Sequence, residues 1–446
     1  MLSDMTDGVH RVEIEPVSPA YRRYAVSFLM LTMLLSFLDR QIINILAEPI
    51  KQELGLADWQ IGLMTGFAFA IFYTTFGIPI ARLAERKSRP LIITCALGAW
   101  SFFTILCGFA GNFVHLLLAR IGVGAGEAGG IPPAHSLISD YTPREKRASA
   151  LAFFHLGVPL GTLLGLGMGG VIVDLYGWRH AFLIAGIPGV AIALLALLTL
   201  KEPRHAIPPA ERPAIEHPSF PDTLRYLASK RSYWFISFGA ALKAFVSYAQ
   251  VPFTAAFFFR VHGEQLEALA SRFGLGAHGF LGISLGIISG FGGMVGIWLG
   301  GQLGDRFGRT DARAYCAIPA IASLAALPFT IAVYLVPSAP VAMALMIIPI
   351  ILGSFWFGPV YTVGQSVVPP TMRATSSAIL LFILNAIGLG LGPLSVGLLS
   401  DLLATSFGLG DAEGVRWALI ASSLLALGTF ALFWTAKRTV RVDMVP

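Results

Sequence analysis

Long apolar runs recur along this chain of 446 residues, from near residue 24 to near residue 436. A run of 18 or more apolar residues crosses about 30 Å of hydrocarbon as an α-helix. Strands are excluded, because an open sheet edge would leave backbone polar groups unpaired in lipid. Only 13% of the residues are charged, fewer than a soluble protein of this length would need. The sequence therefore predicts an all-α membrane protein.

The apolar runs predict twelve transmembrane helices. They cover residues 24–48, 59–82, 90–111, 113–139, 147–174, 179–200, 233–259, 279–303, 312–336, 340–367, 374–403 and 414–436. A proline-rich, charged segment separates the sixth run from the seventh, and residues 220–229 within it have the pattern of a short amphipathic helix. We therefore expect five parts: a tail over 1–23, a six-helix bundle over 24–200, a linker over 201–231, a second six-helix bundle over 232–437 and a tail over 438–446.

A charged loop marks the same place in both halves. Residues 301–309 stand at the end of the eighth span, and a weaker copy, residues 81–89, stands at the end of the second span, with Glu85 in place of Asp305. Nearly the same spacing along the chain separates the arginines that open the fifth and eleventh spans, Arg147 and Arg373. Two markers that repeat at nearly one period predict two pseudo-symmetric bundles, as in secondary transporters, with the substrate site between them.

The positive charges are distributed unevenly. Of the 31 Lys and Arg residues, 23 fall on one side of the predicted membrane, five on the other and three within spans. By the positive-inside rule, both termini and the linker are expected in the cytoplasm, and the inner cell membrane is the expected location. Topology thus explains the net charge of +6, which gives no support to nucleic-acid binding. The three Cys and nine His residues show no metal-ligand spacing, so we predict no metal and no cofactor. No nucleophile–base pair or metal cluster stands near a predicted interface, so we predict no enzyme activity.

Charged residues inside the predicted spans are candidates for function, because lipid makes them costly. They are Asp39, Arg40, Arg120, Glu127 and Lys243. Asp39 and Arg120 lie at similar depth, so a pair between them is geometrically allowed, whereas Glu127 lies near the middle of the bilayer. A carboxylate that exchanges an arginine for a proton would couple proton movement to conformation. A static ion pair is the alternative, and Lys243 either snorkels or binds an anionic headgroup.

These motifs resemble the major facilitator superfamily over nearly the whole chain. Residues 301–309 fit its loop signature closely, and Arg120 followed by Gly122, Gly124 and Gly126 is similar to its fourth-helix signature. The first loop departs from the pattern. The resemblance implies the major facilitator fold and a role in proton coupling for the fourth-helix element. It also implies a cytoplasmic gate, to which we add the two helix-opening arginines: Glu85, Arg86, Asp305, Arg306, Arg147 and Arg373.

A narrower resemblance is to the spinster-like branch, through Asp39-Arg40, the stretch 122–128 and the stretch 177–182. This branch carries sphingolipid- or lysophospholipid-like amphiphiles. Asp39-Arg40 also resembles symporters of organic anions and sugar acids, and multidrug efflux is a third possibility. The stretch 157–161 fits the antiporter signature only partly, which leaves antiport and symport both open.

The expected function is therefore a proton-coupled secondary transporter of an amphiphilic lipid-like substrate, working by alternating access as a monomer. Its partners would be that substrate or another small molecule, protons and membrane lipid. Asp39, Glu127, Arg120 and Arg40 are the proton-coupling candidates. The substrate-binding candidates are Arg40, Glu127, Lys243, Tyr248, Gln250, Phe253, Trp356 and Tyr361. For the aromatic members, a lipid-facing position is the alternative.

Overall fold

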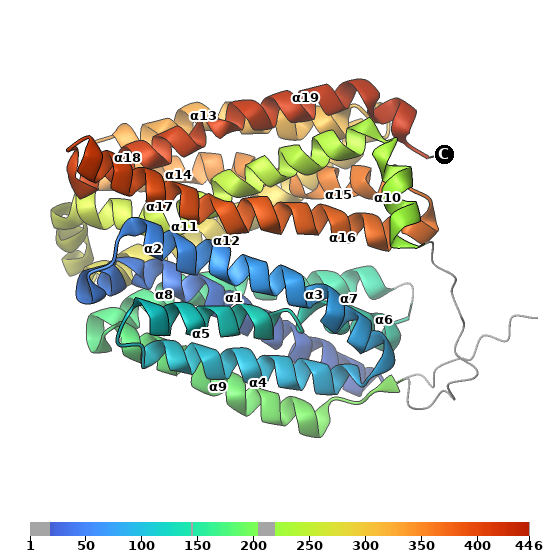
Figure 1. The fold of residues 1–446 in the computed structure, drawn as a ribbon, viewed down its shortest axis with the longest axis horizontal. Helices are drawn as coiled ribbons and strands as arrows, with labels where there is room; N and C mark the ends of the chain where they lie inside the picture. The colour runs from blue at the N-terminus through green and yellow to red at the C-terminus, as the bar shows by residue number, and fades with distance from the viewer. Residues whose placement is uncertain (1–17, 144–145, 204–218, 446) are drawn as a thin grey trace, which may run out of the picture.

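The structure, a computed structural model, describes residues 18–143, 146–203 and 219–445, with the side chains of Ile78, Glu85, Ala148 and Ala374 excepted. Helices make up the described part, in which no strand occurs. Figure 1 shows two helical bundles lying side by side, with the short helix α10 at one end. We call this end, which also holds α6 and α7, the α10 end, and the opposite end, which holds α2 and α18, the α2 end.

The first bundle contains α1 to α9. These elements are α1 (Pro19–Leu54), α2 (Asp58–Gly62), the π-helix η1 (Leu63–Phe67), α3 (Ala68–Arg86), α4 (Arg89–Gly108), α5 (Phe113–Glu127), α6 (Ile131–Tyr141), α7 (Arg147–His155), α8 (Gly157–Tyr176) and α9 (Trp178–Thr199).

The second bundle follows α10 (Phe220–Ala228). Its elements are α11 (Arg231–Arg272), α12 (Ala277–Gly308), α13 (Ala314–Leu335), α14 (Ala339–Gly353), α15 (Phe357–Ser366), the 3₁₀ turn η5 (Pro370–Met372), α16 (Arg373–Ile383), the π-helix η6 (Leu384–Leu391), α17 (Gly392–Asp401), the π-helix η7 (Leu402–Ser406), α18 (Gly410–Ser423) and α19 (Leu425–Asp443).

Eleven helices of the described part are long and apolar enough to cross a membrane. The remaining predicted span, the fourth (113–139), is divided into α5, with 15 residues, and α6, with 11 residues. Each piece is too short to qualify alone, but together they run the length of the bundle (Figure 1). The prediction of an all-α, twelve-span architecture is confirmed.

The second bundle contains a matching interruption. Its tenth span is divided between α14 and α15 at residues 354–356, and the fourth span is divided at residues 128–130. The two breaks are as far apart along the chain as Arg147 and Arg373 are. The repeat seen in the sequence therefore extends to the backbone itself.

Two predicted elements can be compared directly with the structure. The amphipathic segment 220–229 is the helix α10, whose N-cap Ser219 accepts a hydrogen bond from the backbone N–H of Asp222. The seventh span, predicted to end at 259, continues as α11 to Arg272 through a non-helical residue, His262 (φ −123°, ψ 21°). Gln265 in this extension is tied down by Pro337 and Ala339, contacts that hydropathy does not encode.

The bundles meet along two seams near the α2 end, α8 against α12 and α2 against α17. A Cβ atom on Gly282 of α12 would overlap the carbonyl oxygen of Leu166 in α8. A Cβ atom on Gly62 of α2 would overlap the carbonyl oxygen of Pro393 in α17. Both seams therefore need a residue without a side chain, because the backbones touch there.

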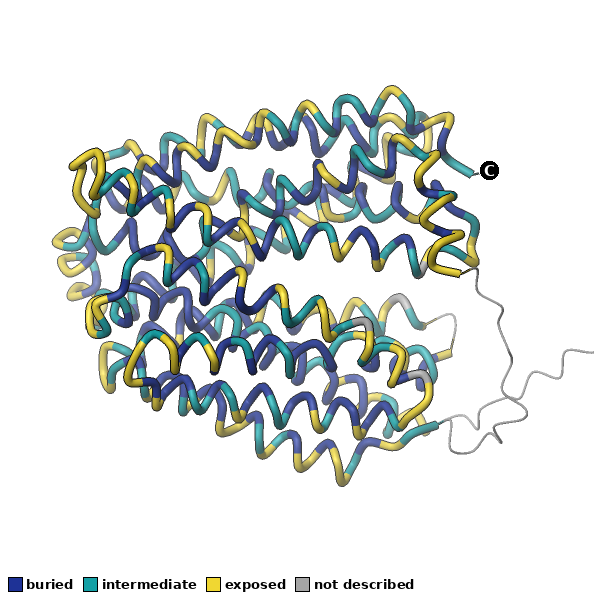
Figure 2. The backbone as a smooth tube through the Cα atoms, viewed as in Figure 1, coloured by how far each residue is buried: buried dark blue, intermediate teal, exposed yellow. Residues whose placement is uncertain are grey.

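Buried residues follow the inner faces of the bundles, whereas exposed residues follow their outer faces and ends (Figure 2). One apolar core joins residues of both bundles, among them Ile42, Met64, Phe253 and Leu389. Two further cores lie nearer the α10 end, one within each bundle. The packed interface between bundles thus belongs to the α2 half of the molecule, and the central pocket lies against it.

Candidate functional site

A central pocket lies between the bundles and takes its walls from both. Its lining residues are Phe37, Arg40, Gln41, Asn44, Thr65, Phe69, Arg120, Tyr248, Val251, Pro252, Leu389 and Pro393. The first seven belong to the first bundle and the last five to the second. A ligand held here would touch both bundles at once, which is the geometry that a transporter of two repeats requires.

Arg40 and Glu127 form an ion pair beside this pocket. The Nε of Arg40 lies 2.5 Å from Oε2 of Glu127, and the hydroxyl of Ser36 donates to the same oxygen at 2.8 Å. The Glu127 side chain is fully buried, whereas 15% of the Arg40 side chain is exposed. Ser36 and Arg40 lie one turn apart on α1, so that one face of this helix holds the carboxylate of α5.

Asp39 is held differently. Its Oδ2 accepts a hydrogen bond from the hydroxyl of Thr104 at 3.0 Å, and the residue is 1% exposed. Among the described residues, no carboxylate lies within 4.0 Å of Arg120, so the Asp39–Arg120 pair that depth allowed is not formed as an ion pair. In this part of the chain, two buried charged groups, Asp39 and Arg120, thus flank the Arg40–Glu127 pair without forming an ion pair of their own.

Aromatic rings surround the two arginines. The Cζ of Arg40 lies 4.5 Å from the ring centroid of Tyr73, 4.8 Å from that of Phe69 and 5.3 Å from that of Phe37. Phe69 is shared, since the Cζ of Arg120 lies 5.5 Å from its centroid. Cation–π attraction stabilises guanidinium groups that have left water. This cage holds Arg40 in place while part of it remains open to the pocket.

Unsatisfied polar atoms gather at this cluster. Five buried atoms have no hydrogen-bond partner within the described part of the chain: Oδ1 of Asp39, Nη2 of Arg40, Nε and Nη1 of Arg120, and Oε1 of Glu127. Each such atom costs about 1–3 kcal/mol when it stays unpaired, and more when the group is charged. Such a concentration marks a place where water, a proton or a polar ligand would be stabilising.

The predicted substrate residues on the seventh span divide into two groups. Tyr248 lines the central pocket, next to Val251 and Pro252. The side chain of Gln250 instead donates to the hydroxyl of Ser423 at 2.9 Å, and Phe253 is 1% exposed within the apolar core. Of the three, the structure therefore brings Tyr248 alone to the charged cluster.

Lys243, Trp356 and Tyr361 lie nearer the break in the tenth span. A Cβ atom on Gly353 would lie 3.0 Å from Nζ of Lys243, which places this amine at the C-terminus of α14. A helix C-terminus carries partial negative charge and unpaired carbonyls, so a cation is favoured there. Trp356 and Tyr361 are linked through Phe357, whose ring contacts both. Trp356 is 8% exposed and packs in a core of the second bundle.

The predicted gate residues lie apart at the α10 end. Arg86, Asp305 and Arg306 are exposed, and within the described residues none of them makes an ion pair. Arg147 donates to the carbonyl of Thr142, and Arg373 donates to that of Gln365, each within its own bundle. The side chain of Glu85 lies outside the described part.

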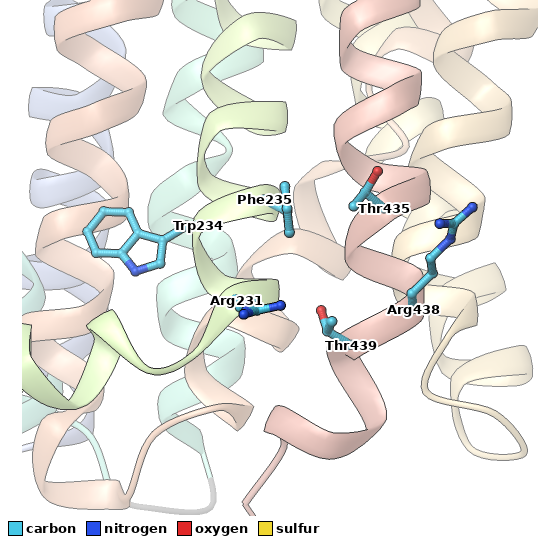
Figure 3. Close-up of a pocket in the computed structure, with 6 residues that line it drawn as sticks. All are labelled: Arg231, Trp234, Phe235, Thr435, Arg438 and Thr439. Carbon is cyan, nitrogen blue, oxygen red and sulfur yellow. The ribbon is translucent and has the colours of Figure 1, made fainter.

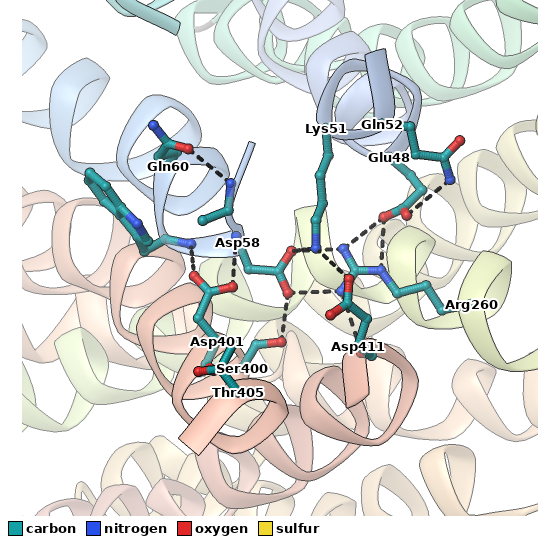
Figure 4. A network of polar contacts seen from close by, with 12 residues as sticks. Glu48, Lys51, Gln52, Asp58, Gln60, Arg260, Ser400, Asp401, Thr405 and Asp411 are labelled. Carbon is teal, nitrogen blue, oxygen red and sulfur yellow. Dashed lines mark hydrogen bonds and ion pairs between the residues drawn. The ribbon is translucent and has the colours of Figure 1, made fainter. Parts of the chain in front are cut away.

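A polar network joins the bundles at the opposite, α2 end (Figure 4). Arg260 of α11 contacts Asp58 of the first bundle in a bidentate arrangement, at 2.7 and 2.8 Å. The same guanidinium reaches Glu48 of α1 at 2.8 Å. Lys51 bridges Asp58 and Asp411 at 2.9 and 3.0 Å, and the hydroxyl of Ser400 donates to Asp58 at 2.6 Å.

Two helix N-termini at this end are capped by the other bundle. Asp401 accepts from the backbone N–H of Asp58 at 3.0 Å and of Trp59 at 2.8 Å. Asp174 at the end of α8 accepts from the N–H of Gly279 at 2.7 Å, at the start of α12. Carboxylates satisfy free N–H groups and the positive end of a helix dipole, so both contacts hold the bundles together.

Sequence reasoning missed several of these residues. Ser36, Thr104 and Tyr73 stand in ordinary apolar helices, where hydropathy assigns them no role. The α2-end network consists of residues at the predicted limits of spans, which the topology count treated as loop charge. For Arg260, Asp58 and Glu48, the sequence offered one indication: residues of opposite charge stand at the same predicted side of the membrane. In the described residues, no group of three His, Cys, Asp or Glu side chains is arranged to hold a metal ion.

Comparison with known proteins agrees with this architecture. The family model described as Major Facilitator Superfamily matches residues 29–393. An "MFS-type efflux pump" of Mycolicibacterium smegmatis is 31% identical over 421 residues, which cover 94% of each chain. Human "Protein spinster homolog 1" is 27% identical over 445 residues, 96% of this chain and 83% of that protein.

A solved structure shows the same arrangement. It is the crystal structure of a bacterial homologue of the human lysosomal transporter Spinster, in an inward-facing and unoccupied conformation. It has 32% sequence identity and a TM-score of 0.86, with 96% of this chain and 100% of that chain covered. The fold, the pocket between two repeats and these matches identify a transporter rather than an enzyme, and the chain belongs to the major facilitator superfamily.

Proposed function

We propose that this protein is a proton-coupled secondary transporter that moves an amphiphilic lipid-like substrate, of the sphingolipid or lysophospholipid type, by alternating access. The observation that carries the proposal is the buried Arg40–Glu127 pair at 2.5 Å, beside a pocket lined by both bundles. A carboxylate that exchanges its arginine for a proton would free Arg40 to hold an anionic headgroup. Asp39, with one satisfied oxygen, is the second proton-binding candidate.

The pocket chemistry supports an amphiphile. Arg40 offers a partly exposed guanidinium for a phosphate or carboxylate. Phe37, Phe69, Tyr248 and Leu389 supply apolar surface suited to an acyl chain. The resemblance to the spinster-like branch, with which relatives named spinster agree, makes this substrate class the first one to test.

The proposed cycle alternates closure at the two ends. Ion pairs and helix caps tie the bundles together at the α2 end. At the α10 end, the gate candidates whose side chains the structure describes make no ion pair between bundles within the described part of the chain: Arg86, Asp305, Arg306, Arg147 and Arg373. The distribution of Lys and Arg supports an inner-membrane protein whose α10 end faces the cytoplasm. We therefore assign the state as inward-facing. In the outward-facing state, Glu85, Arg86, Asp305 and Arg306, together with Arg147 and Arg373, would close the α10 end.

A second candidate is efflux of small apolar or cationic compounds, which the match to an efflux pump over 94% of both chains favours. Symport of small organic anions or sugar acids is the third. The three are separated by the substrate that moves and by the direction of the proton gradient that drives it.

The deciding experiment is uptake by proteoliposomes that contain the purified protein, with and without a pH gradient. The substrates offered are a lysophospholipid, a sphingoid lipid, a sugar acid and a cationic dye. Gradient-driven movement of either lipid, reduced in Glu127→Gln and retained in Arg23→Gln, is the expected result. Movement of the dye or of the sugar acid alone would overturn the lipid assignment, and equal movement in Glu127→Gln would overturn the proton role.

A further inference from the structure

A groove on the outer side of the second bundle lies at the α10 end, between the start of α11 and the end of α19 (Figure 3). It is lined by Arg231, Trp234, Phe235, Thr435, Arg438 and Thr439. None of these residues lines the central pocket, and neither the charged cluster nor the α2-end network reaches it. The proposed transport cycle gives this groove no role.

The two arginines of the groove have no acidic partner among the residues that the structure describes. Within the described residues, neither the side chain of Arg231 nor that of Arg438 makes an ion pair or a hydrogen bond, and both residues are exposed. The carboxylate that ends α19, that of Asp443, instead accepts from the backbone N–H of Ser232 at 2.8 Å. Arg231 also opens α11, where the helix dipole adds positive potential. The groove therefore offers two free guanidinium groups and a net positive field.

Aromatic rings lie at the same level as these charges. Trp234 stacks on Phe238 with a centroid separation of 6.3 Å, and its indole N–H donates to the carbonyl of Leu227 in α10. On α19, Phe430 stacks on Trp434 at 5.4 Å, and Nζ of Lys437 lies 4.0 Å from the Trp434 ring. Tryptophan beside Lys and Arg is typical of the boundary between hydrocarbon and headgroups.

The surface that continues from the groove toward the α2 end is apolar. Phe238 on α11 is 43% exposed and Leu427 on α19 is 49% exposed. In a membrane, such side chains contact acyl chains, and the cations beyond them contact headgroups. The groove thus combines an apolar wall with a cationic base, the two features that a phospholipid with an anionic headgroup requires.

We propose that this groove is a binding site for an anionic diacyl phospholipid of the surrounding membrane. Its phosphate contacts Arg231 and Arg438, which present N–H donors in the fixed fork that suits phosphate oxygens. Thr439, which faces Arg231 across the groove (Figure 3), lies beside the phosphate. The bound lipid bridges the first and last spans of the second bundle, so the site is structural and separate from transport.

The test is lipid retention, measured by native mass spectrometry of the full-length protein in detergent with added phosphatidylglycerol or phosphatidylcholine. We expect phosphatidylglycerol to be retained preferentially. The double variant Arg231→Gln/Arg438→Gln should lower its affinity by about fivefold for each arginine removed. The matched control is Arg23→Gln/Arg82→Gln, which removes two exposed arginines from the same end of the other bundle and should retain the lipid.

Three outcomes would overturn the site: equal retention of both lipids, unchanged retention in the groove variant, or an equal loss in both double variants. The last would indicate general electrostatics rather than a groove. If the double variant does not fold, the single variant Arg438→Gln gives the same comparison, with an expected loss of affinity of about fivefold. Arg40→Gln, which disables the proposed substrate site, should retain phosphatidylglycerol, so failure of the transport proposal stays distinguishable from failure of this one.

Discussion

Asp174 and Asp401 occupy equivalent places in the two repeats, and each caps a helix of the opposite bundle. Asp401 accepts the N–H groups that begin α2, and Asp174 accepts those that begin α12, with the ring of His278 at 2.8 Å. The receiving residues, Asp58 and His278, are separated along the chain by the same period as the two charged loops. The same kind of contact, a carboxylate of one bundle capping a helix of the other, therefore occurs twice at the α2 end.

Both caps should resist opening of the α2 end. Removing one helix cap costs about 1 kcal/mol. The double variant Asp174→Ala/Asp401→Ala should therefore raise the population of molecules that are open at the α2 end by a few tens of times at most. The measurement is the rate at which a membrane-impermeant thiol reagent, added from the α2 side, modifies a cysteine placed at Asn44 in a Cys95→Ser background. Ser219→Ala, which removes the cap of α10 within one bundle, should leave that rate unchanged. Equal rates in both variants would contradict the cap assignment.

Glu127→Gln and Asp39→Asn should each reduce transport driven by a pH gradient, on the order of tenfold or more, because each removes an ionisable group from the membrane interior. Both substitutions keep size and shape, so folded yield should be unchanged. Uptake in proteoliposomes, normalised to folded protein, is the measurement. Full gradient-driven transport by both variants would remove the proton relay. Loss of folded protein would instead indicate a structural ion pair.

Arg260→Gln should destabilise the described state strongly. It leaves Asp58 and Glu48 buried without their guanidinium, and breaking a buried pair costs about 3–5 kcal/mol. Lys51 still contacts Asp58, which puts the loss at the lower end of that range. Arg260→Lys should recover only part of it, since one ammonium cannot reproduce the bidentate geometry. Thermal unfolding in detergent should give the stability order wild type, then Arg260→Lys, then Arg260→Gln. The control is Arg416→Gln, because the partner of Arg416, Glu413, lies on the same helix.

Acid should release the end of α19. The backbone N–H of Arg313 and the guanidinium of Arg441 hold the pKa of Asp311, in the loop between α12 and α13, below its usual value. Because the folded-state pKa is lowered, the stabilisation is present above the unfolded value near 3.8 and is lost as pH falls below it. A spin label at Val442, which is 83% exposed, should become more mobile in that range. Asp311→Asn should show that mobility already at pH 7, whereas an unchanged spectrum would exclude the contact.

Hydropathy and repeat spacing predicted the twelve spans, their pairing into two repeats and the short helix α10. They could do so because the cost of unpaired backbone in lipid leaves few alternatives. Hydropathy also identified the five intramembrane charges, four of which meet at the central cluster. Hydropathy did not identify the partners of these charges. Depth along the helices allowed an ion pair between Asp39 and Arg120, but the rotation of each helix about its own axis places Arg40 against Glu127 instead.

The α2-end network could not be predicted from the sequence for a different reason. Its members stand where spans begin and end, and a window average of hydropathy does not distinguish a loop charge from an interfacial one. Glu48, Asp58, Arg260 and Asp401 become a unit only when the bundles are placed together. The repeat could have paired Asp174 with Asp401, but nothing in one sequence says that each reaches across to the other bundle.

The breaks at residues 128–130 and 354–356 interrupt two spans that would otherwise be continuous helices. The segments α5 and α14 stay in the half of the molecule where the bundles are packed, while α6 and α15 lie beyond the break (Figure 1). We expect bending at these two breaks to move α6 and α15 inward while the contacts of Asp174, Asp401 and Arg260 are kept. In the proposed cycle, the α10 end would then close before the α2 end opens, so that an occluded state would enclose the substrate between two closed ends.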